Sequence, residues 1–136
     1  MTALTNGRPI EERAGILFTD PVAAAKKIYA GALVCLDASG NATPGAVSAT
    51  LKARGVARET VDNSAGGAGA ATVTTAKGIF PFANSADTDE ITRADIGGTA
   101  YIVDDQTVAK THATNARSAA GKIMDIDEYG VWVKID

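Results

Sequence analysis

The strongest structural signal in this sequence is a predicted β-hairpin close to its C-terminal end. Residues 131–135 read Val-Trp-Val-Lys-Ile, residues 122–126 are also rich in strand-forming side chains, and Asp-Glu-Tyr-Gly at 127–130 is typical of a turn. Comparable short runs, separated by turns, recur about every 8–12 residues. The sequence therefore predicts a mainly β fold, either a small β-sandwich or a small barrel.

About seven or eight short strands are expected in all, together with one or two short helices. The pair Asp20-Pro21 is typical of a helix start, and the acidic segment at 87–90 predicts another. Gly78 and Pro81 lie within one predicted strand, so we expect a bulge and an edge position there. The other expected elements are strands at residues 14–19, 28–36, 47–51, 55–58, 71–82 and 99–104, helices at 22–27 and 87–96, a turn at 37–41, a flexible loop at 62–71 and a long loop at 105–121.

The chain divides into a short arm and one domain. Residues 1–13 are polar and charged, and we interpret them as a flexible N-terminal arm, disordered or extended when the protein is alone; an ordinary frayed terminus is the alternative. Residues 14–136 are predicted to form a single β-rich domain, since 136 residues is the usual size of one domain. The 27 Ala, 15 Thr and 14 Gly suit tightly turned β structure better than helices packed through Leu.

Composition excludes several classes of protein. One Cys and one His cannot make a disulfide framework or a Cys/His zinc site. The net charge of −3 argues against a general nucleic-acid binder. No apolar run approaches the roughly 20 residues that cross a bilayer, and the N-terminal segment lacks the apolar core of a signal peptide. We therefore expect a soluble protein made in a reducing cytosol, without a membrane or nucleic-acid partner.

Residues that commonly carry catalysis are present but not arranged for it. His112 lies in a polar stretch without a nucleophile motif, and Cys35 has apolar neighbours and no adjacent cation. The Gly-rich segment at 66–69 leads into a predicted strand, whereas a phosphate-binding loop leads into a helix. We expect His112 on a surface loop and Cys35 in the core. The sequence predicts a protein that is not an enzyme and that has no cofactor and no metal site.

An acidic stretch is the most distinctive charged feature. Residues 87–105 hold six carboxylates against Arg93 alone, a local charge of −5. A solvated acidic face is the simplest interpretation. The alternatives are a patch that docks on a basic partner, a calcium site, or paired carboxylates for glycoside hydrolysis. The spacing lacks the order of an EF-hand loop, and no aromatic platform for a sugar accompanies the carboxylates in the sequence.

Trp132, the only tryptophan, lies on the predicted hairpin. If Val131 and Val133 face the core, Trp132 points to the opposite face, because side chains alternate along a strand. An exposed Trp on a strand is typical of an interface anchor. Equally, the loop at 105–121 could cover the ring.

Five segments, taken in order, resemble the capsid decoration, or cement, proteins of tailed bacteriophages, in particular those of Mu-like transposable phages. The resemblance spans about residues 14–136, while the arm at 1–13 lies outside it. The five segments are residues 28–42 (Ile-Tyr-Ala-Gly-Ala-Leu-Val-Cys-Leu-Asp-Ala-Ser-Gly-Asn-Ala), residues 54–57 (Arg-Gly-Val-Ala), residues 95–108 (Asp-Ile-Gly-Gly-Thr-Ala-Tyr-Ile-Val-Asp-Asp-Gln-Thr-Val), residues 118–123 (Ser-Ala-Ala-Gly-Lys-Ile) and residues 130–135 (Gly-Val-Trp-Val-Lys-Ile).

The resemblance implies a virion protein without catalytic residues. Such proteins bind the outside of the expanded head near its threefold positions, commonly as trimers, and bridge neighbouring major capsid subunits. Another small virion component, of the tail tube or neck, is the alternative, followed by a carbohydrate- or calcium-binding module. If the resemblance holds, the expected apolar contacts are Ile10, Tyr101, Tyr129 and Trp132, and the expected charged contacts are Arg8, Arg13, Asp87, Asp89 and Glu90.

Overall fold

Strands dominate the described part of the chain. The computed structural model describes residues 2–13 and 15–136; Met1 and Ala14, where the predicted arm and the predicted domain begin, lie outside the described residues. Two short 3-10 helices, η1 (Asp87–Asp89) and η2 (Arg93–Asp95), replace the single helix expected at 87–96. The prediction of a mainly β fold is confirmed. The strands are β1 (Leu17–Pro21), β2 (Lys26–Ile28), β3 (Leu33–Leu36), β4 (Ala42–Pro44), β5 (Lys52–Ala57), β6 (Val61–Asn63), β7 (Thr72–Ala76), β8 (Gly78–Phe82), β9 (Thr99–Ile102), β10 (Val108–Ala109), β11 (Ala119–Asp127) and β12 (Gly130–Ile135).

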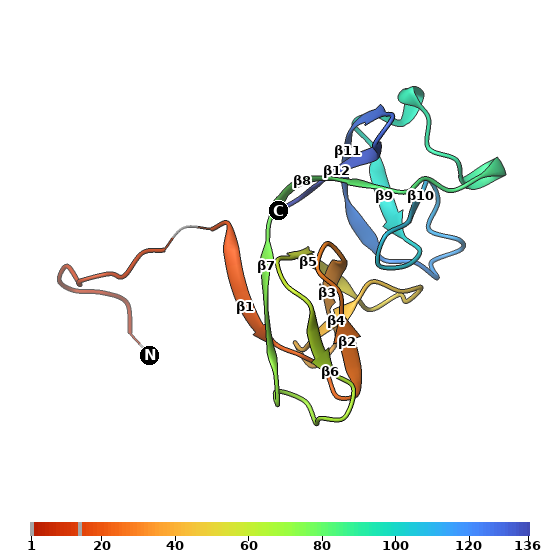
Figure 1. Ribbon diagram of the computed structural model, residues 1–136. Coiled ribbons are helices and arrows are strands. Elements are labelled where there is room, and N and C mark those ends of the chain that lie inside the picture. The colour runs from red at the N-terminus through yellow and green to blue at the C-terminus, as the bar shows by residue number, and fades with distance from the viewer. Residues whose placement is uncertain (1, 14) are drawn as a thin grey trace.

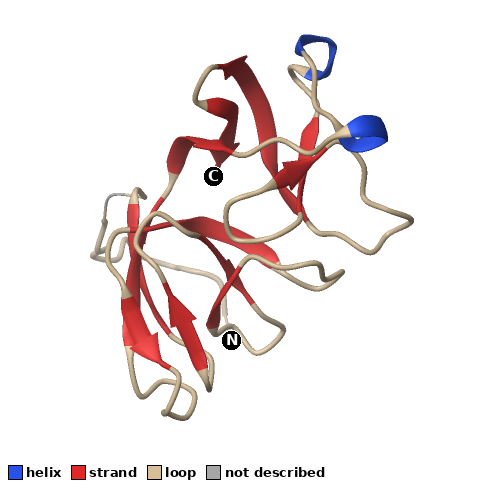
Figure 2. Ribbon diagram, turned by 45° about the vertical axis from the view of Figure 1, so that its right-hand side comes forward, coloured by secondary structure: helices blue, strands red, loops and turns tan. Residues whose placement is uncertain are grey.

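These strands form three antiparallel sheets (Figures 1 and 2). The first sheet has the order β1-β7-β5-β3-β4, the second has the order β10-β9-β11-β12-β8, and β2 pairs with β6 in a small ribbon. The first sheet is open at β1 and β4. The edges of the second sheet approach each other at a bridge between Ala83 and Thr107, beyond the end of β8. The architecture is therefore a stack of open sheets and not a closed barrel.

Strand β3 lies at the centre of this stack because both of its faces are buried. Leu33 and Cys35 belong to one core cluster with residues of the second sheet, such as Ile123. Val34, which points the other way, belongs to a second cluster with Ile28 of the ribbon. The first sheet is thus a middle layer. The expectation that Cys35 is a core side chain is confirmed, and burial raises the pKa of its thiol to about 12.

The C-terminal hairpin forms as predicted. Strands β11 and β12 pair from Lys122–Lys134 to Asp127–Gly130, with a bulge between Ile123 and Asp125. The expected edge position of Pro81 is also confirmed, since β8 is the last strand of the second sheet. The bulge expected at Gly78 is wrong: at this residue (φ 150°) the chain leaves the first sheet after β7 and enters the second.

The helix predicted at 22–27 does not form. A helix start needs the Asp20 carboxylate to accept hydrogen bonds from the first free N–H groups. Instead, Arg54 donates two hydrogen bonds to that carboxylate, at 2.8 and 3.1 Å. The backbone N–H of Val22 donates to Ala71, and Ala25 adopts a left-handed conformation (φ 57°). A contact with a distant strand therefore overrides the local helix signal.

Four further segments differ from expectation. The single strand expected at 28–36 divides into the last residue of β2 and the whole of β3, with a turn in residues 29–32 between them. Residues 47–51 form no strand, because Ser118 holds this segment as a loop by donating to the carbonyl of Ser48 and accepting from the N–H of Leu51. The loop expected at 62–71 begins within β6 and then folds over the buried side chain of Asn63. The long loop expected at 105–121 contains β10 and the first residues of β11.

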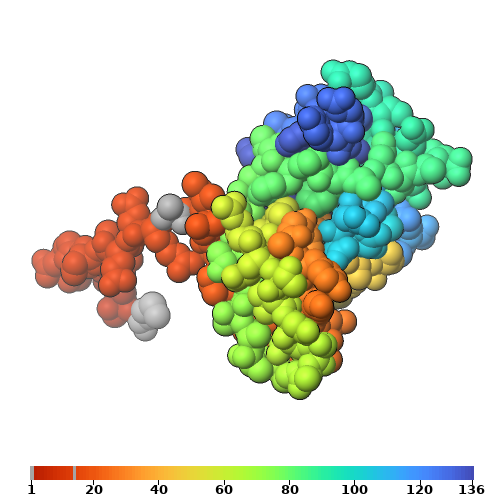
Figure 3. All heavy atoms as spheres, in the orientation of Figure 1, coloured from red at the N-terminus to blue at the C-terminus, as the bar shows by residue number. Residues whose placement is uncertain are grey.

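Most of the arm extends away from the sheets, whereas the Arg13 guanidinium lies 5.3 Å from the centroid of the Phe18 ring on β1. Residues 2–13 contain no helix or strand and are exposed throughout. They extend away from the body on the β1 side (Figures 1 and 3). Among the described residues, no helix has the length and apolar character needed to cross a membrane.

Candidate functional site

The outer face of the second sheet carries the aromatic residues of the hairpin. Val131, Val133 and Ile135 point into the core, and Trp132 and Lys134 point outward, as the alternation predicts. The neighbouring edge strand β8 places Pro81 opposite Trp132 and Ile79 opposite Lys134, and both are exposed. We call Ile79, Pro81, Trp132 and Lys134 the outer face.

Trp132 is half-buried, between the two alternatives that the sequence left open. Its Nε1 is buried and has no hydrogen-bond partner among the described residues. The Tyr129 ring meets the indole edge-on, with centroids 6.3 Å apart, and Tyr129 itself is 70% exposed. Two of the predicted apolar contacts therefore lie together at the end of the hairpin.

Tyr101 does not join this aromatic pair. It lies on β9, two strands away from β12, and it is half-buried. Its ring packs edge-on against His112, with centroids 5.7 Å apart. His112 is exposed on a loop, as expected, and its Nδ1 accepts a hydrogen bond from the N–H of Asn115. Tyr101 and His112 thus support each other at one end of the sheet.

The acidic stretch contains one ordered turn, residues 86–90, which we call the acidic turn. The side-chain amide of Asn84 closes it by bonding both the N–H and the carbonyl of Ile91, at 2.9 and 2.8 Å. The N–H of Glu90 donates to the carbonyl of Asp87. Asp87 and Glu90 are exposed, so their carboxylates face solvent from a fixed backbone.

Asp89, also predicted as a contact residue, is turned inward instead. Its carboxylate accepts a hydrogen bond from Thr111 Oγ1 at 2.5 Å and forms an ion pair with Arg117 at 3.3 Å. Its backbone carbonyl accepts from the N–H of Lys110. The hydrogen bond from Thr111, followed by the contacts of Arg117, lowers the pKa of Asp89. Asp89 therefore joins the acidic turn to the loop after β10.

Asp89→Asn is expected to destabilise the protein in a pH-dependent way. Because the pKa of Asp89 is lower in the folded chain than its ordinary 3.8, ionised Asp89 stabilises the fold above that pH, and this stabilisation is lost as pH falls through the lowered pKa. Urea denaturation of wild type and Asp89→Asn across acidic pH measures the effect. The difference in free energy of unfolding should be constant near neutrality and shrink below pH 3.8. A difference that stays constant at low pH would contradict this role.

The acidic residues do not gather into a metal site. Within residues 2–13 and 15–136, no three His, Cys, Asp or Glu side chains lie close enough together to hold a metal ion. Asp95 closes a capping box with Thr92 and lies 3.9 Å from Lys110, and Asp125 pairs with Arg93. The calcium-binding interpretation therefore has no support from the arrangement of these carboxylates.

A cluster that sequence reasoning missed surrounds Phe18 on β1. Three cations lie near its ring centroid: Arg54 at 4.1 Å, Arg13 at 5.3 Å and Lys77 at 5.3 Å. We call Arg13, Phe18, Arg54 and Lys77 the basic patch. No local pattern in the sequence could reveal it, because its members come from the arm, β1, β5 and the segment between β7 and β8.

One of the three cations in the basic patch, Arg54, forms an ion pair. Arg54 is the extra residue at a bulge, since Cys35 pairs with Ala53 and Val34 with Gly55, and it reaches across to the carboxylate of Asp20. Neither Arg13 nor Lys77 forms an ion pair with another described residue. The patch therefore presents two unpaired cations beside an aromatic ring.

The remaining predicted contacts lie on the arm. Arg8 is exposed, and Ile10 is 74% exposed. The arm leaves the body beside the basic patch, whereas the acidic turn follows β8 on the other side of the molecule (Figure 1). The predicted contact residues thus form three separate surfaces: the arm with the basic patch, the outer face with Tyr129, and the acidic turn.

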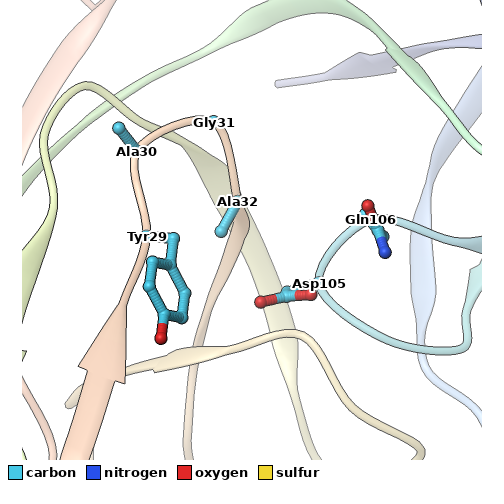
Figure 4. Close-up of a pocket in the computed structure, with 6 residues that line it drawn as sticks. All are labelled: Tyr29, Ala30, Gly31, Ala32, Asp105 and Gln106. Atoms are coloured by element: carbon cyan, nitrogen blue, oxygen red, sulfur yellow. The ribbon is translucent and has the colours of Figure 1, made fainter.

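A shallow pocket of about 380 Å³ lies where the turn between β2 and β3 meets the turn between β9 and β10 (Figure 4). Apart from alanine methyl groups, the side chains that line it are those of Tyr29, Asp105 and Gln106. Lys27 Nζ lies 4.9 Å from the centroid of the Tyr29 ring, so one face of the ring is already covered. The pocket brings an aromatic ring close to a carboxylate of the acidic stretch, which the sequence did not suggest.

Comparisons with protein-family models, with curated proteins and with solved structures found no match for this chain.

Proposed function

We propose that this chain is a decoration (cement) protein of a tailed-phage head, a non-enzymatic virion component that binds the outer surface of the expanded capsid. Its partner is the major capsid protein, and copies of the chain associate with one another, as a trimer, on the head. The resemblance of five segments to Mu-like decoration proteins motivates the proposal. A tail-tube or neck component is the alternative within the virion.

The exposed arm is the observation that carries the proposal. Residues 2–13 extend from an edge strand of the first sheet, and two apolar side chains on them, Leu4 and Ile10, are 70% and 74% exposed. Burying one such side chain against a partner stabilises a complex by about 1.5–3 kcal/mol. Because each head would bind many copies, modest contacts of this kind sum to a large effect on the lattice.

Selective binding explains how such a protein could stabilise a head. A protein that binds only the expanded lattice shifts the equilibrium toward that lattice by mass action. Purified protein should therefore co-sediment saturably with expanded heads and not with unexpanded heads. Equal binding to the two forms would contradict the mechanism. A few copies per particle would favour the neck or tail alternative.

Removal of residues 1–13 is expected to weaken binding to expanded heads by at least about tenfold, or roughly 1.4 kcal/mol. The far-UV circular dichroism and thermal midpoint should stay unchanged, since the arm contributes no strand to the sheets. Ile10→Ser should lose part of the affinity. Val47→Ser is the matched control, because Val47 is also exposed (55%) but lies on a loop of the body. Full affinity without the arm would rule out its role.

Glycan binding is a second candidate, favoured by the pocket at Tyr29. Carbohydrate sites commonly combine an aromatic ring with carboxylate and amide side chains that bond hydroxyl groups, and Tyr29, Asp105 and Gln106 supply these groups. Titration calorimetry with a panel of soluble oligosaccharides tests this function. A heat of binding that wild type shows and Tyr29→Ala lacks would support glycan binding. No heat of binding with wild type would rule it out.

A further inference from the structure

The two charged surfaces of this chain lie at opposite ends of the molecule. The basic patch adjoins the base of the arm at β1, and the acidic turn follows β8 on the far side of the second sheet (Figures 1 and 3). The uneven charge is also visible along the sequence, since residues 1–68 sum to +1 and residues 69–136 to −4. Neither surface can neutralise the other within one copy.

The acidic turn is organised before any partner arrives. Hydrogen bonds from Asn84 and the backbone close the turn, and Asp89 joins it to Thr111 and Arg117. Only Asp87 and Glu90 keep carboxylates that form no ion pair with other described residues of the turn or its neighbours. Because little conformational freedom would be lost on binding, such a turn is suited to docking.

The basic patch suits an anionic partner. Three cations lie around one ring, and the Asp20 carboxylate pairs with only one of them, Arg54. Arg13 and Lys77 keep their charges unpaired among the described residues. Ile16 and Leu17, adjacent on the chain, are 60% and 52% exposed and would add apolar area to a contact.

We infer that the acidic turn of one copy docks on the basic patch of the next copy, with Asp87 and Glu90 against Arg13 and Lys77. The carboxylates of the acidic turn would pair with the two cations that form no ion pair within the described residues. Since the two surfaces differ and lie at opposite ends, the contact is head-to-tail, and it closes into a ring when the rotation between copies permits. This inference rests on the proposed self-association of the chain but not on its binding to capsids.

Salt sensitivity follows because Arg13, Asp87 and Glu90 are exposed. Ion pairs between exposed side chains are screened over about 10 Å at an ionic strength near 0.1 M. Association should therefore weaken as salt is added, while the apolar contacts of Ile16, Leu17 and Phe18 contribute a part that salt does not weaken. Both contributions, ionic and apolar, can be measured by sedimentation velocity. The purified full chain is run over a range of concentrations at low and at high ionic strength.

Charge exchange between the two surfaces tests the contact directly. One variant carries Arg13→Glu and Lys77→Gln, and another carries Asp87→Asn and Glu90→Lys. Asn is chosen for position 87 because φ there is 57°, a conformation that Asn tolerates. Each variant should associate at least about tenfold more weakly than wild type, since like charges then face each other. The chain with all four substitutions should regain association, because the reversed charges attract again.

The controls separate this contact from general charge effects. The four substitutions together leave the net charge at −3, so restored association cannot come from a change in overall repulsion. Lys52→Gln with Arg58→Glu changes the charge of the first sheet by the same amount at exposed positions and should leave association unchanged.

Three results would overturn the inference. The first is a wild-type chain that stays monomeric at every concentration. The second is a chain with all four substitutions that associates as weakly as either double variant. The third is a control variant whose association weakens as much as that of the double variants. Co-sedimentation with expanded heads distinguishes these failures from failure of the proposed function. A chain that binds heads but stays monomeric would keep the decoration function and lose the head-to-tail contact.

Discussion

Leu33→Ala is expected to lower the free energy of unfolding by about 2–5 kcal/mol, the range for a buried Leu whose neighbours cannot close the cavity. Leu33 is fully buried on β3, in a core cluster made mostly of second-sheet residues. Its backbone is also fixed, since its N–H donates to Asp105 and its carbonyl accepts from Gly45. The surrounding structure therefore cannot collapse easily into the space.

This variant also tests whether the two large sheets unfold together. Trp132 fluorescence reports on the second sheet, whereas far-UV circular dichroism reports on all strands. Both signals should shift to lower urea concentration by the same amount, because Leu33 of the first sheet contributes to the shared core. Val47→Ala, at an exposed position, should change the stability by less than about 0.5 kcal/mol. Two separate transitions, or a loss below about 1 kcal/mol, would contradict a single shared core.

Asn63→Asp should cost at least about 3 kcal/mol, because it replaces two buried donor hydrogens by a charged acceptor of the same size. Asn63 is buried on β6, and its Nδ2 lies 3.0–3.3 Å from the carbonyl oxygens of Val22, Ala23 and Gly67. A carboxylate there would face three carbonyl oxygens. Burial of the charge would disfavour ionisation of the new carboxyl, so the loss should shrink as pH falls and the group is protonated.

Urea denaturation at neutral and acidic pH measures this loss. Asn115→Asp is the matched control, since Asn115 is exposed and its side chain forms no hydrogen bond with another described residue. It should change the stability by no more than about 0.5 kcal/mol. If Asn63→Asp were equally mild, the loop after β6 would not depend on the Asn63 amide.

The features predicted correctly from the sequence depend on local patterns. The hairpin of β11 and β12 could be predicted because alternation and a turn lie within one short segment. Pro81 could be assigned to an edge because proline cannot donate to a neighbouring strand on its free side. Cys35 could be assigned to the core from its apolar neighbours. Each inference needed only residues close together in the chain.

The failures all depend on distant contacts. The local sequence indicates a helix cap at Asp20, but Arg54 of β5 binds the Asp20 carboxylate instead. The local sequence indicates an exposed contact residue at Asp89, but its carboxylate accepts a hydrogen bond from Thr111 and pairs with Arg117. In each case a tertiary contact satisfies a polar group that the local pattern assigns elsewhere.

The candidate site could be predicted only in part, for the same reason. Of the four apolar contacts that the sequence predicts, only Tyr129 and Trp132 lie together, at the end of the hairpin. The basic patch could not be anticipated, since Arg13, Phe18, Arg54 and Lys77 come from four segments. Its assembly requires β1 to pair with β7, and β7 with β5, which no local signal specifies.

The most direct test of the proposed function is quantitative mass spectrometry of purified particles of the phage that, under this proposal, encodes the chain. Copies of the chain are counted against copies of the major head subunit. Decoration of the whole lattice predicts numbers comparable to those of that subunit. A handful of copies per particle would place the chain in the neck or tail instead, and its complete absence from particles would contradict a role in the virion.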